Sequence, residues 1–400
     1  MCSVCGIGRN RFFAIRKAIQ VPRRIILSYR LNKRLHNNDN IKMEDIREKT
    51  LRYVESLRIK SNTYGKYLYS GRQKEPVLYA SAYAALTRHL YRDLEAIPDK
   101  DRKEWVSYIK SHQASDGLFK DPLINNEMAS TCDWWGWRHL TLHVIMALTA
   151  LDATVDRKFA FLEPLRDQEY AIKWLDDRAW QSSPANVSNE VQNCITLLQY
   201  ARDFQGEAWA GNTIEVMLNW LDEKQDPDSG LWGNRFDDPY KLSNGVQTGY
   251  HLWLLYFYEK RKINYLNSII DNTLNTQGNL GGFGVMCNSS ACEDIDSIDP
   301  LVRLYFQTDH RSAEVKKALE RALPWVLTNM NEDGGFVFRR LQGFEYGHKK
   351  MYSKSEESAM FPTWFRTLSL AYLSKIVSNS PNIRLDWQFI HCPGHQFWID

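Results

Sequence analysis

Long apolar runs are missing from this sequence. Its 400 residues contain no stretch of the roughly 18 uninterrupted apolar residues that a membrane-spanning helix needs. The first residues also lack the apolar core and small-residue cleavage site of a signal peptide. The sequence therefore predicts a cytoplasmic protein.

Cysteine is scarce, and no metal-ligand pattern is complete. Seven cysteines are scattered along the chain, which predicts reduced thiols and not a disulfide framework. Cys2 and Cys5 form a CxxC pair with no second pair to complete a zinc site. His139 and His143 have the i, i+4 spacing that metals use, but no third ligand accompanies them, so we interpret them as core residues. The run His391 to His395, which includes Cys392, is interpreted as a tail packed over the domain.

Acidic residues are absent from the first 38 positions, which hold nine Lys and Arg. The rest of the chain, with 42 basic and 48 acidic residues, has a net charge of −6. Phe12, Ile15 and Ile19 lie at helical spacing among these cations. Residues 1–40 are therefore predicted to be a basic arm, either solvated or, through residues 8–34, lying on anionic lipid. Nucleic acid is not an expected partner, because aromatic and basic residues are not interleaved elsewhere.

Aromatic residues are abundant, with 14 Trp, 20 Tyr and 17 Phe, and several follow a recurring glycine turn. The turns are Ser115 to Phe119, Asp228 to Trp232, Leu280 to Phe283 and Asp333 to Phe336. Gly230, Gly282 and Gly334 are 52 residues apart. Glycine permits the positive φ that ends a helix, and the aromatic side chain after it can plug the turn against the next repeat.

Each turn separates an amphipathic helix from a more apolar one. The apolar segments are 78–94, 136–151, 189–203, 245–260, 296–308 and 358–376. Helices that are apolar on nearly every side are buried, so these should form an inner ring. An outer helix at 42–59 would pack beside the last inner helix and close the ring. The sequence predicts an all-α fold in which residues 41–400 form one (α/α)6 toroid.

This repeat resembles that of the terpenoid cyclase and protein prenyltransferase toroids, over residues 70–376. The most specific stretch is Gly281 to Ser297, where a Gly-Gly-Phe turn leads into Asp294-Ile295-Asp296-Ser297. It is similar to the DxDD acid motif of class II terpene cyclases, with Ser at the fourth position. The resemblance implies that Asp296 donates a proton to an isoprenoid, that Asp294 and Asp299 assist it, and that no cofactor or only a divalent cation is needed.

In a hairpin toroid, the N-terminal ends of the inner helices converge on one face. We expect the substrate to bind there, between Trp134, Trp135, Trp137, Arg138, Glu190, Asn193, Gln247, Tyr250, His251, Glu357, Phe361 and Trp364. Aromatic faces can stabilise a carbocation, and they can equally stack on sugars while polar groups bind the hydroxyls.

Three functions remain open at this point. The first is a class II cyclase acting on an isoprenoid. The second is a carbohydrate-acting enzyme or polysaccharide-assembly factor, with Glu190, Asp296 and Glu357 as candidate acid and base. The third is a toroid that binds a partner without catalysis. An apolar cavity beneath Asp296 would favour the first, and an open groove rimmed by Arg138, Glu190 and Gln247 the second.

Overall fold

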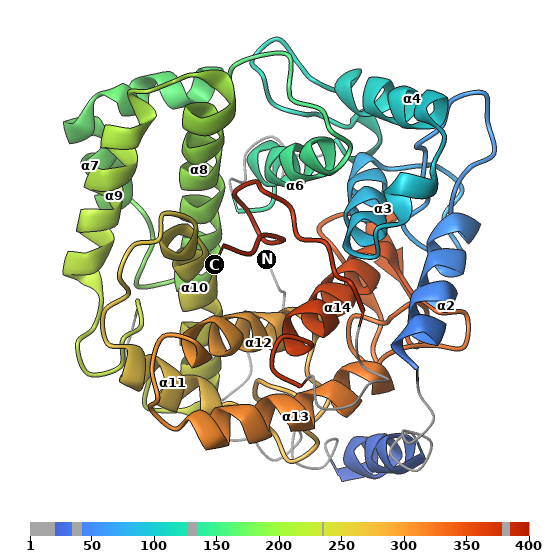
Figure 1. Cartoon of the computed structure of the whole chain (residues 1–400). Coiled ribbons are helices and arrows are strands. Elements are labelled where there is room, and N and C mark those ends of the chain that lie inside the picture. Colours follow the sequence, from blue (N-terminus) through green and yellow to red (C-terminus); the bar gives the residue numbers. More distant parts are fainter. Residues whose placement is uncertain (1–20, 34–41, 126–133, 234–235, 378–384, 400) are drawn as a thin grey trace.

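The computed structural model describes residues 21–33, 42–125, 134–233, 236–377 and 385–399, and their helices form two concentric rings (Figure 1). The inner ring contains α3 (Leu78–Leu90), α6 (Trp137–Ala150), α8 (Pro184–Gln205), α10 (Pro239–Tyr258), α12 (Ala291–Tyr305) and α14 (Met360–Leu373). The outer ring contains α2 (Met43–Ser56), α4 (Asp99–Lys110), α7 (Gln168–Asp176), α9 (Ala210–Lys224), α11 (Leu266–Leu274) and α13 (Ser312–Thr328). The predicted all-α toroid of helical hairpins is confirmed.

The inner ring is closed. Each inner helix contacts the next one along the chain, and α14 contacts α3. All residues of α3 and α14 are buried, as expected for helices that are apolar on every side. The outer ring is completed by α2, which comes first along the chain and packs on α3. The Thr50 hydroxyl of α2 donates a hydrogen bond to the carbonyl oxygen of Gly334 at 3.1 Å, which links the first outer helix to the last turn.

The glycine turns join neighbouring repeats. Gly117 and Gly334 have φ values of +86° and +91°, in the left-handed region that favours glycine. A Cβ atom on Gly117 would lie 2.0 Å from the carbonyl oxygen of Lys158, and one on Gly334 would lie 2.1 Å from that of Lys49. Both carbonyls belong to the next repeat around the ring. Glycine is therefore required for the backbone conformation and for the close approach of the neighbour.

Three of the four turns are also bonded to the first half of an inner helix. The backbone N–H of Phe119 donates to the hydroxyl of Thr141 at 2.9 Å, and that of Phe336 donates to Thr363 at 3.0 Å. In the repeat between them along the chain, the N–H of Phe283 donates to the carboxylate of Asp294 at 3.0 Å. These bonds place the turns and the N-terminal ends of the inner helices at the same end of the ring.

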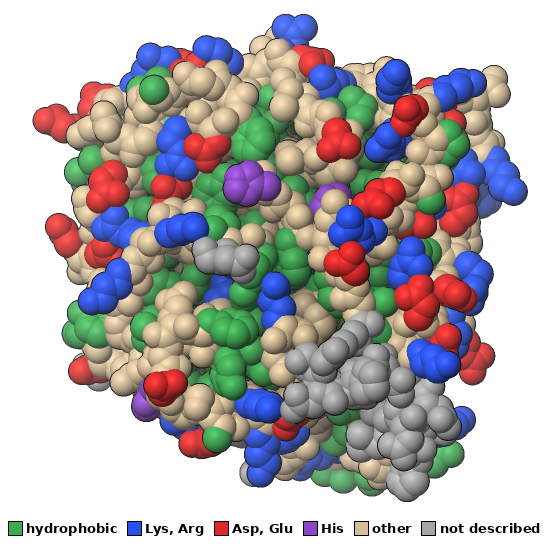
Figure 2. Space-filling model, in the orientation of Figure 1, with side chains coloured by type: hydrophobic (Ala, Val, Ile, Leu, Met, Phe, Trp, Pro, Cys, Tyr) green, Lys and Arg blue, Asp and Glu red, His purple; other side chains and the backbone are tan. Residues whose placement is uncertain are grey.

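The C-terminal segment enters the ring. Residues 385–399 run into its centre (Figure 1), where the Gln396 side chain accepts a hydrogen bond from Trp364 Nε1 at 2.7 Å. Arg303 donates to the carbonyl oxygen of Phe397 at 2.7 Å. The predicted tail therefore lies inside the toroid and not merely over it. Figure 2 shows charged side chains around the edge of this face and apolar ones toward its centre.

The remaining elements are short or peripheral. β1 (Phe344–Glu345) and β2 (Tyr352–Ser353) form an antiparallel pair in the long connection before α14. Short 3-10 helices cover Asp93–Ala96, Pro122–Ile124, Ala160–Arg166 and Lys349–Met351. A helix at residues 21–33 lies outside the rings, and the rest of the predicted basic arm, with Cys2 and Cys5, lies outside the described residues. Among the described helices, none is long and apolar enough to span a bilayer.

Candidate functional site

A pocket of about 390 Å³ lies between the N-terminal halves of the inner helices and the C-terminal segment. Helices α6, α8, α10, α12 and α14 contribute to its wall, together with the connections before α6 and α14. It is lined by Trp134, Trp135, His139, His143, Ala185, Asn186, Asn189, Gln247, His251, Ser290, Cys292, Glu293, Asp296, Phe338, Arg339, Phe344, Glu345, Tyr346, Gly347, Phe361, Phe365 and His395. The lining is both aromatic and polar.

The acidic cluster, which consists of Glu293, Asp294, Asp296 and Asp299, lies in the N-terminal part of α12. Ser290 caps this helix, accepting a hydrogen bond from the Glu293 N–H, while the Glu293 carboxylate accepts one from the Ser290 N–H. This reciprocal capping box explains why Glu293 stands at this position. The Glu293 carboxylate also forms an ion pair with Arg339 at 2.6 Å.

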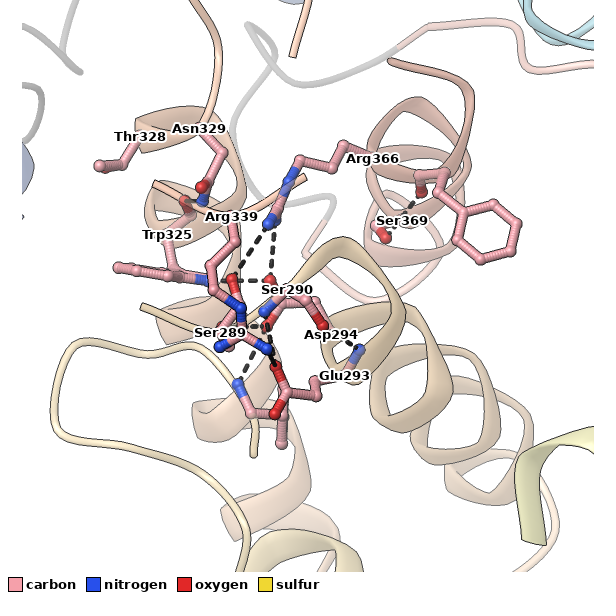
Figure 3. Close-up of polar contacts among 12 residues, drawn as sticks. Ser289, Ser290, Glu293, Asp294, Trp325, Thr328, Asn329, Arg339, Arg366 and Ser369 are labelled. Atoms are coloured by element: carbon pink, nitrogen blue, oxygen red, sulfur yellow. Dashed lines mark hydrogen bonds and ion pairs between the residues drawn. The ribbon is translucent and has the colours of Figure 1, made fainter. Parts of the chain in front are cut away.

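Asp294 is enclosed by hydrogen-bond donors from α13, α14 and the connection before α12 (Figure 3). Its carboxylate accepts bonds from Arg366 Nη1 at 2.8 Å and from Trp325 Nε1 at 2.9 Å. The Ser289 hydroxyl donates at 2.7 Å and the Phe283 N–H at 3.0 Å. Asp294 thus occupies the anchoring position that Thr141 and Thr363 occupy in other repeats, and it does not line the pocket.

Asp299 is fully buried, nearly one turn further along α12 than Asp296, and it does not line the pocket. Its carboxylate accepts a hydrogen bond from Arg303 Nε at 2.5 Å. Burial raises the pKa of Asp299 to about 6, although the Arg303 guanidinium opposes this rise. Arg303 in turn donates to the Tyr372 hydroxyl at 2.9 Å. This pair holds the C-terminal segment in the ring.

Asp296 is the carboxyl group of the cluster that faces the pocket. It is buried, and among the described residues no hydrogen bond or ion pair is made to its carboxyl oxygens. Burial raises its pKa well above the usual value, and the negative charges of Glu293, Asp294 and Asp299 raise it further. Asp296 is therefore a buried carboxyl group whose raised pKa favours the protonated form, and it faces a cavity.

Four histidines surround the same cavity. The rings of His139 and His143 lie 4.4 Å apart between centroids, and those of His143 and His395 lie 5.6 Å apart. Burial lowers the pKa of His143 and of His251 to about 4, and it holds the pKa of His139 and His395 well below the usual range. The four imidazoles are thus neutral near pH 7 and act as hydrogen-bonding groups.

The tautomer of His139 follows from its neighbours. The Tyr79 hydroxyl lies 3.0 Å from the Trp135 carbonyl oxygen, which can only accept, and 2.6 Å from His139 Nδ1. All of these bonds are satisfied when Tyr79 donates to the carbonyl and His139 Nδ1–H donates to Tyr79. His139 Nε2 then accepts a hydrogen bond from the Tyr346 hydroxyl, 3.2 Å away. Tyr346 is held at the pocket with its oxygen as a potential acceptor.

Aromatic rings form one wall of the pocket. The rings of Tyr346 and Phe361 stack at 4.3 Å between centroids.

Trp135 Nε1 and His143 Nε2 are buried without a hydrogen-bond partner among the described residues. Because an unpaired buried polar atom is costly, these atoms are suited to contact a polar ligand or water.

Of the twelve predicted substrate-binding residues, five line the pocket and two more lie directly behind the lining. Trp134, Trp135, Gln247, His251 and Phe361 line it together with Asp296. Tyr250 and Trp364 are buried behind the lining, with the Tyr250 hydroxyl 3.3 Å from His395 Nδ1. Asn193 is buried within α8, and Trp137 lies at the start of α6 outside the lining.

Three predicted residues lie away from the pocket. The Arg138 guanidinium lies over the Phe161 ring, 4.4 Å from its centroid. Glu190 forms an ion pair with Arg178 at 3.3 Å. Glu357 forms one with Arg72 at 2.7 Å. None of the three lines the pocket, because each helix start is rotated by its own packing, and the expected approach of Asp296 to these side chains is not found.

Several pocket residues were not selected from the sequence as site residues. His139 and His143 were interpreted as core, and His395 as part of a tail. Tyr346 and Arg339 lie in the connection before α14, where no repeat pattern locates side chains. Of these residues, only His139 and His143 could have been indicated by the sequence, through their i, i+4 spacing. Within the described residues, no three His, Cys, Asp or Glu side chains are arranged to hold a metal ion.

A comparison with solved structures gives matches of low identity, with TM-scores below 0.5. A GH76 α-mannanase from Bacteroides thetaiotaomicron has a TM-score of 0.49 and 13% identity, covering 86% of this chain and 99% of that one. A GH76A α-1,6-mannanase variant of Salegentibacter sp., in complex with α-1,6-mannotetrose, has a TM-score of 0.43 and 12% identity, covering 83% and 98%. An ent-copalyl diphosphate synthase from Streptomyces platensis has a TM-score of 0.40 and 12% identity, covering 75% of this chain and 50% of that one.

At these scores and identities the likeness is one of fold and says nothing about the reaction. No family model matches the chain, and no curated protein matches it. The resemblance to terpenoid cyclases therefore extends to the toroid and not to a family assignment.

Proposed function

We propose that the protein is a carbohydrate-active enzyme in which Asp296 acts as the general acid at a glycosidic bond. The supporting observation is the state of Asp296: a buried carboxyl group with a raised pKa, facing a pocket that is aromatic and polar. A carboxylic acid that remains protonated near neutral pH can protonate the oxygen of a leaving sugar.

The pocket lining favours a sugar over an isoprenoid. Protonation of an alkene also needs a strong acid, but a hydrocarbon chain needs an apolar cavity. Polar side chains occupy much of this lining, including those of Asn186, Asn189, Gln247, Glu293 and Arg339. A polyprene would offer these polar groups no further hydrogen bonds, whereas sugar hydroxyls could bond to them. The carbohydrate hypothesis is therefore preferred to the cyclase hypothesis.

Glu293 is the candidate for the second carboxylate. It lies three residues before Asp296 on α12, so both side chains lie on neighbouring parts of one helix surface, and both line the pocket. Its ion pair with Arg339 holds a carboxylate next to the acid. In this proposal Glu293 accepts a proton from the attacking water while Asp296 donates one to the leaving oxygen.

Tyr346 and Trp134 would orient the sugar. The Tyr346 hydroxyl donates its hydrogen bond to His139 Nε2, so its oxygen can accept a hydrogen bond from a sugar hydroxyl. Trp134, which is partly exposed at the pocket, can supply a ring face on which an apolar sugar face stacks. These groups bind and position, and the proton transfers belong to the two carboxyl groups.

The test is turnover of defined probes by the purified full chain. The probes are neutral oligosaccharides including α-1,6-mannotetrose, uronic-acid oligosaccharides, and geranylgeranyl diphosphate. We expect cleavage of a saccharide, measured as new sugar ends. Asp296→Asn should lower the rate by about a hundredfold to ten-thousandfold, the usual contribution of general acid catalysis. Quenching of tryptophan fluorescence by the same saccharide should persist.

Glu357→Gln is the matched control, because this carboxylate is ion-paired away from the pocket, and its rate should equal that of the wild type. Conversion of geranylgeranyl diphosphate with no turnover of any saccharide would show that the cyclase hypothesis is the correct one. Saccharide binding without turnover across the panel would instead support a non-catalytic binding protein.

A further inference from the structure

The helix at residues 21–33 exposes an unusual amount of apolar surface. Val21, Ile25, Ile26 and Tyr29 are 59%, 66%, 43% and 70% exposed. These four make up half of the strongly exposed large apolar side chains in the described chain. Single exposed apolar residues are ordinary, but a group of them on one short helix marks an interaction surface.

The exposed side chains share one face of the helix, and a second apolar face is already covered. Val21, Ile25 and Tyr29 follow each other at i, i+4 spacing. Leu27 and Leu31, which are 0% and 9% exposed, lie on the opposite side at about 100° per residue. The second face packs on the protein body, and within the described part of the chain nothing covers the first face.

At about 100° per residue, the cations Arg24 and Lys33 border the exposed face, whereas Arg23 and Arg30 lie toward the protein body. Arg23, Arg24, Arg30 and Lys33 belong to this helix, and the first 38 residues contain no Asp or Glu. Arg30 forms an ion pair with Glu356 of the body. An apolar face bordered by cations, with no acidic residue, is typical of helices that lie in the interface of an anionic bilayer.

The helix is held by the same connection that lines the pocket. Glu356, which pairs with Arg30, lies in the connection between α13 and α14. That connection also supplies Arg339, Glu345 and Tyr346 to the pocket lining. Figure 1 shows the helix at the periphery of the ring, near α13. A surface bound by this helix would lie beside the loops of the site.

We propose that the helix at residues 21–33 docks the protein on an anionic lipid bilayer, with Val21, Ile25 and Tyr29 inserted among the acyl chains. The cations that border this face then lie at the level of the lipid phosphates. A second copy of the chain fits this face less well, because two such helices would bring their cations together without any acidic residue to neutralise them. This inference is independent of the reaction catalysed in the pocket.

Flotation of the full chain with vesicles tests the inference. Vesicles of phosphatidylcholine with phosphatidylglycerol should bind the protein. Vesicles of phosphatidylcholine alone should bind it more weakly, by a factor of at least about five for each cation that contacts the membrane surface. Replacing Val21, Ile25 and Tyr29 together by Ser should weaken binding at least about tenfold, because their apolar area no longer leaves water. Arg24→Gln should weaken it about fivefold, and added salt should weaken it further.

The matched control replaces Tyr170 and Ile172 of α7 by Ser, since these side chains are 44% and 38% exposed but lie elsewhere on the surface. Its binding should equal that of the wild type. The proposal is overturned if the wild type does not float with anionic vesicles, or if the triple variant floats equally well. It is also overturned if the wild type forms a dimer in sedimentation that the triple variant loses, since a second copy would then cover the face.

Discussion

Asp294 and Arg366 form an ion pair at 2.8 Å in which both side chains are fully buried, whereas Asp296, two residues further on, has no cationic partner. Among the four carboxyl groups at the start of α12, Glu293 pairs with Arg339 and Asp299 with Arg303. Of the two that line the pocket, Glu293 and Asp296, only Asp296 has no cationic partner among the described residues. Burial and the neighbouring negative charges raise the pKa of Asp296, and no cation opposes that rise.

Turnover should therefore depend on the acid form of Asp296. The pKa of this group is raised well above the usual value, so the proton is present below the raised pKa and lost above it. We expect the rate at saturating substrate to fall as pH increases through that pKa. A pH–rate profile measures this, and a rate that keeps rising into alkaline solution would contradict the role of Asp296 as the acid.

Replacing Arg366 by Met should destabilise the fold by about 3–5 kcal/mol, because it leaves the Asp294 charge buried without a cation. The free energy of unfolding in urea measures the change. Adding Asp294→Asn to this variant should restore part of the loss, since the uncompensated charge is then removed. Equal effects in the single and double variants would show that the ion pair itself contributes little.

The buried histidines should make stability depend on pH. The pKa of His143 is about 4 in the folded protein and about 6.5 in the unfolded chain, so the unfolded chain binds the proton first as the pH falls. Its contribution is present above about pH 6.5 and is lost as the pH falls toward 4, by about 3 kcal/mol at most.

His143→Gln removes this titrating group while keeping side-chain polarity. The stability of the variant relative to the wild type should therefore increase as the pH falls from 7 toward 4, by an amount measurable in urea titrations at each pH. The pKa of Asp299, about 6, has the opposite effect on stability, but it is common to both proteins and cancels in the difference. A difference that does not change with pH would mean that His143 is protonated alike in the folded and unfolded states.

Gly334→Ala should destabilise the ring where it closes. A Cβ atom there would lie 2.1 Å from the Lys49 carbonyl oxygen, and φ is +91°, so we expect a loss of at least about 1–2 kcal/mol. Gly71→Ala is the control, since nothing lies within 4 Å of its added methyl group. Thermal unfolding of the two variants compares them directly, and equal melting temperatures would contradict the closure contact.

Much of the fold could be predicted from the sequence, because its determinants are local or periodic. The glycine turns at 52-residue spacing and the apolar inner segments each specify a hairpin, and hairpins that bury their apolar faces on one another must stack into a ring. Asp296 was also predicted as the central acid from its neighbours in the motif, and the structure places it in the pocket.

The composition of the site was decided by tertiary structure alone. The C-terminal segment brings His395 into the ring from a position with no repeat pattern, and the connection before α14 folds Tyr346 against His139. The rotation of each inner helix, which depends on its packing with two neighbours, directs Gln247 into the pocket and Glu190 toward Arg178. Periodicity indicates which helices meet at the centre, but only long-range packing determines which side chains face the cavity and which carboxyl group is left without a cation.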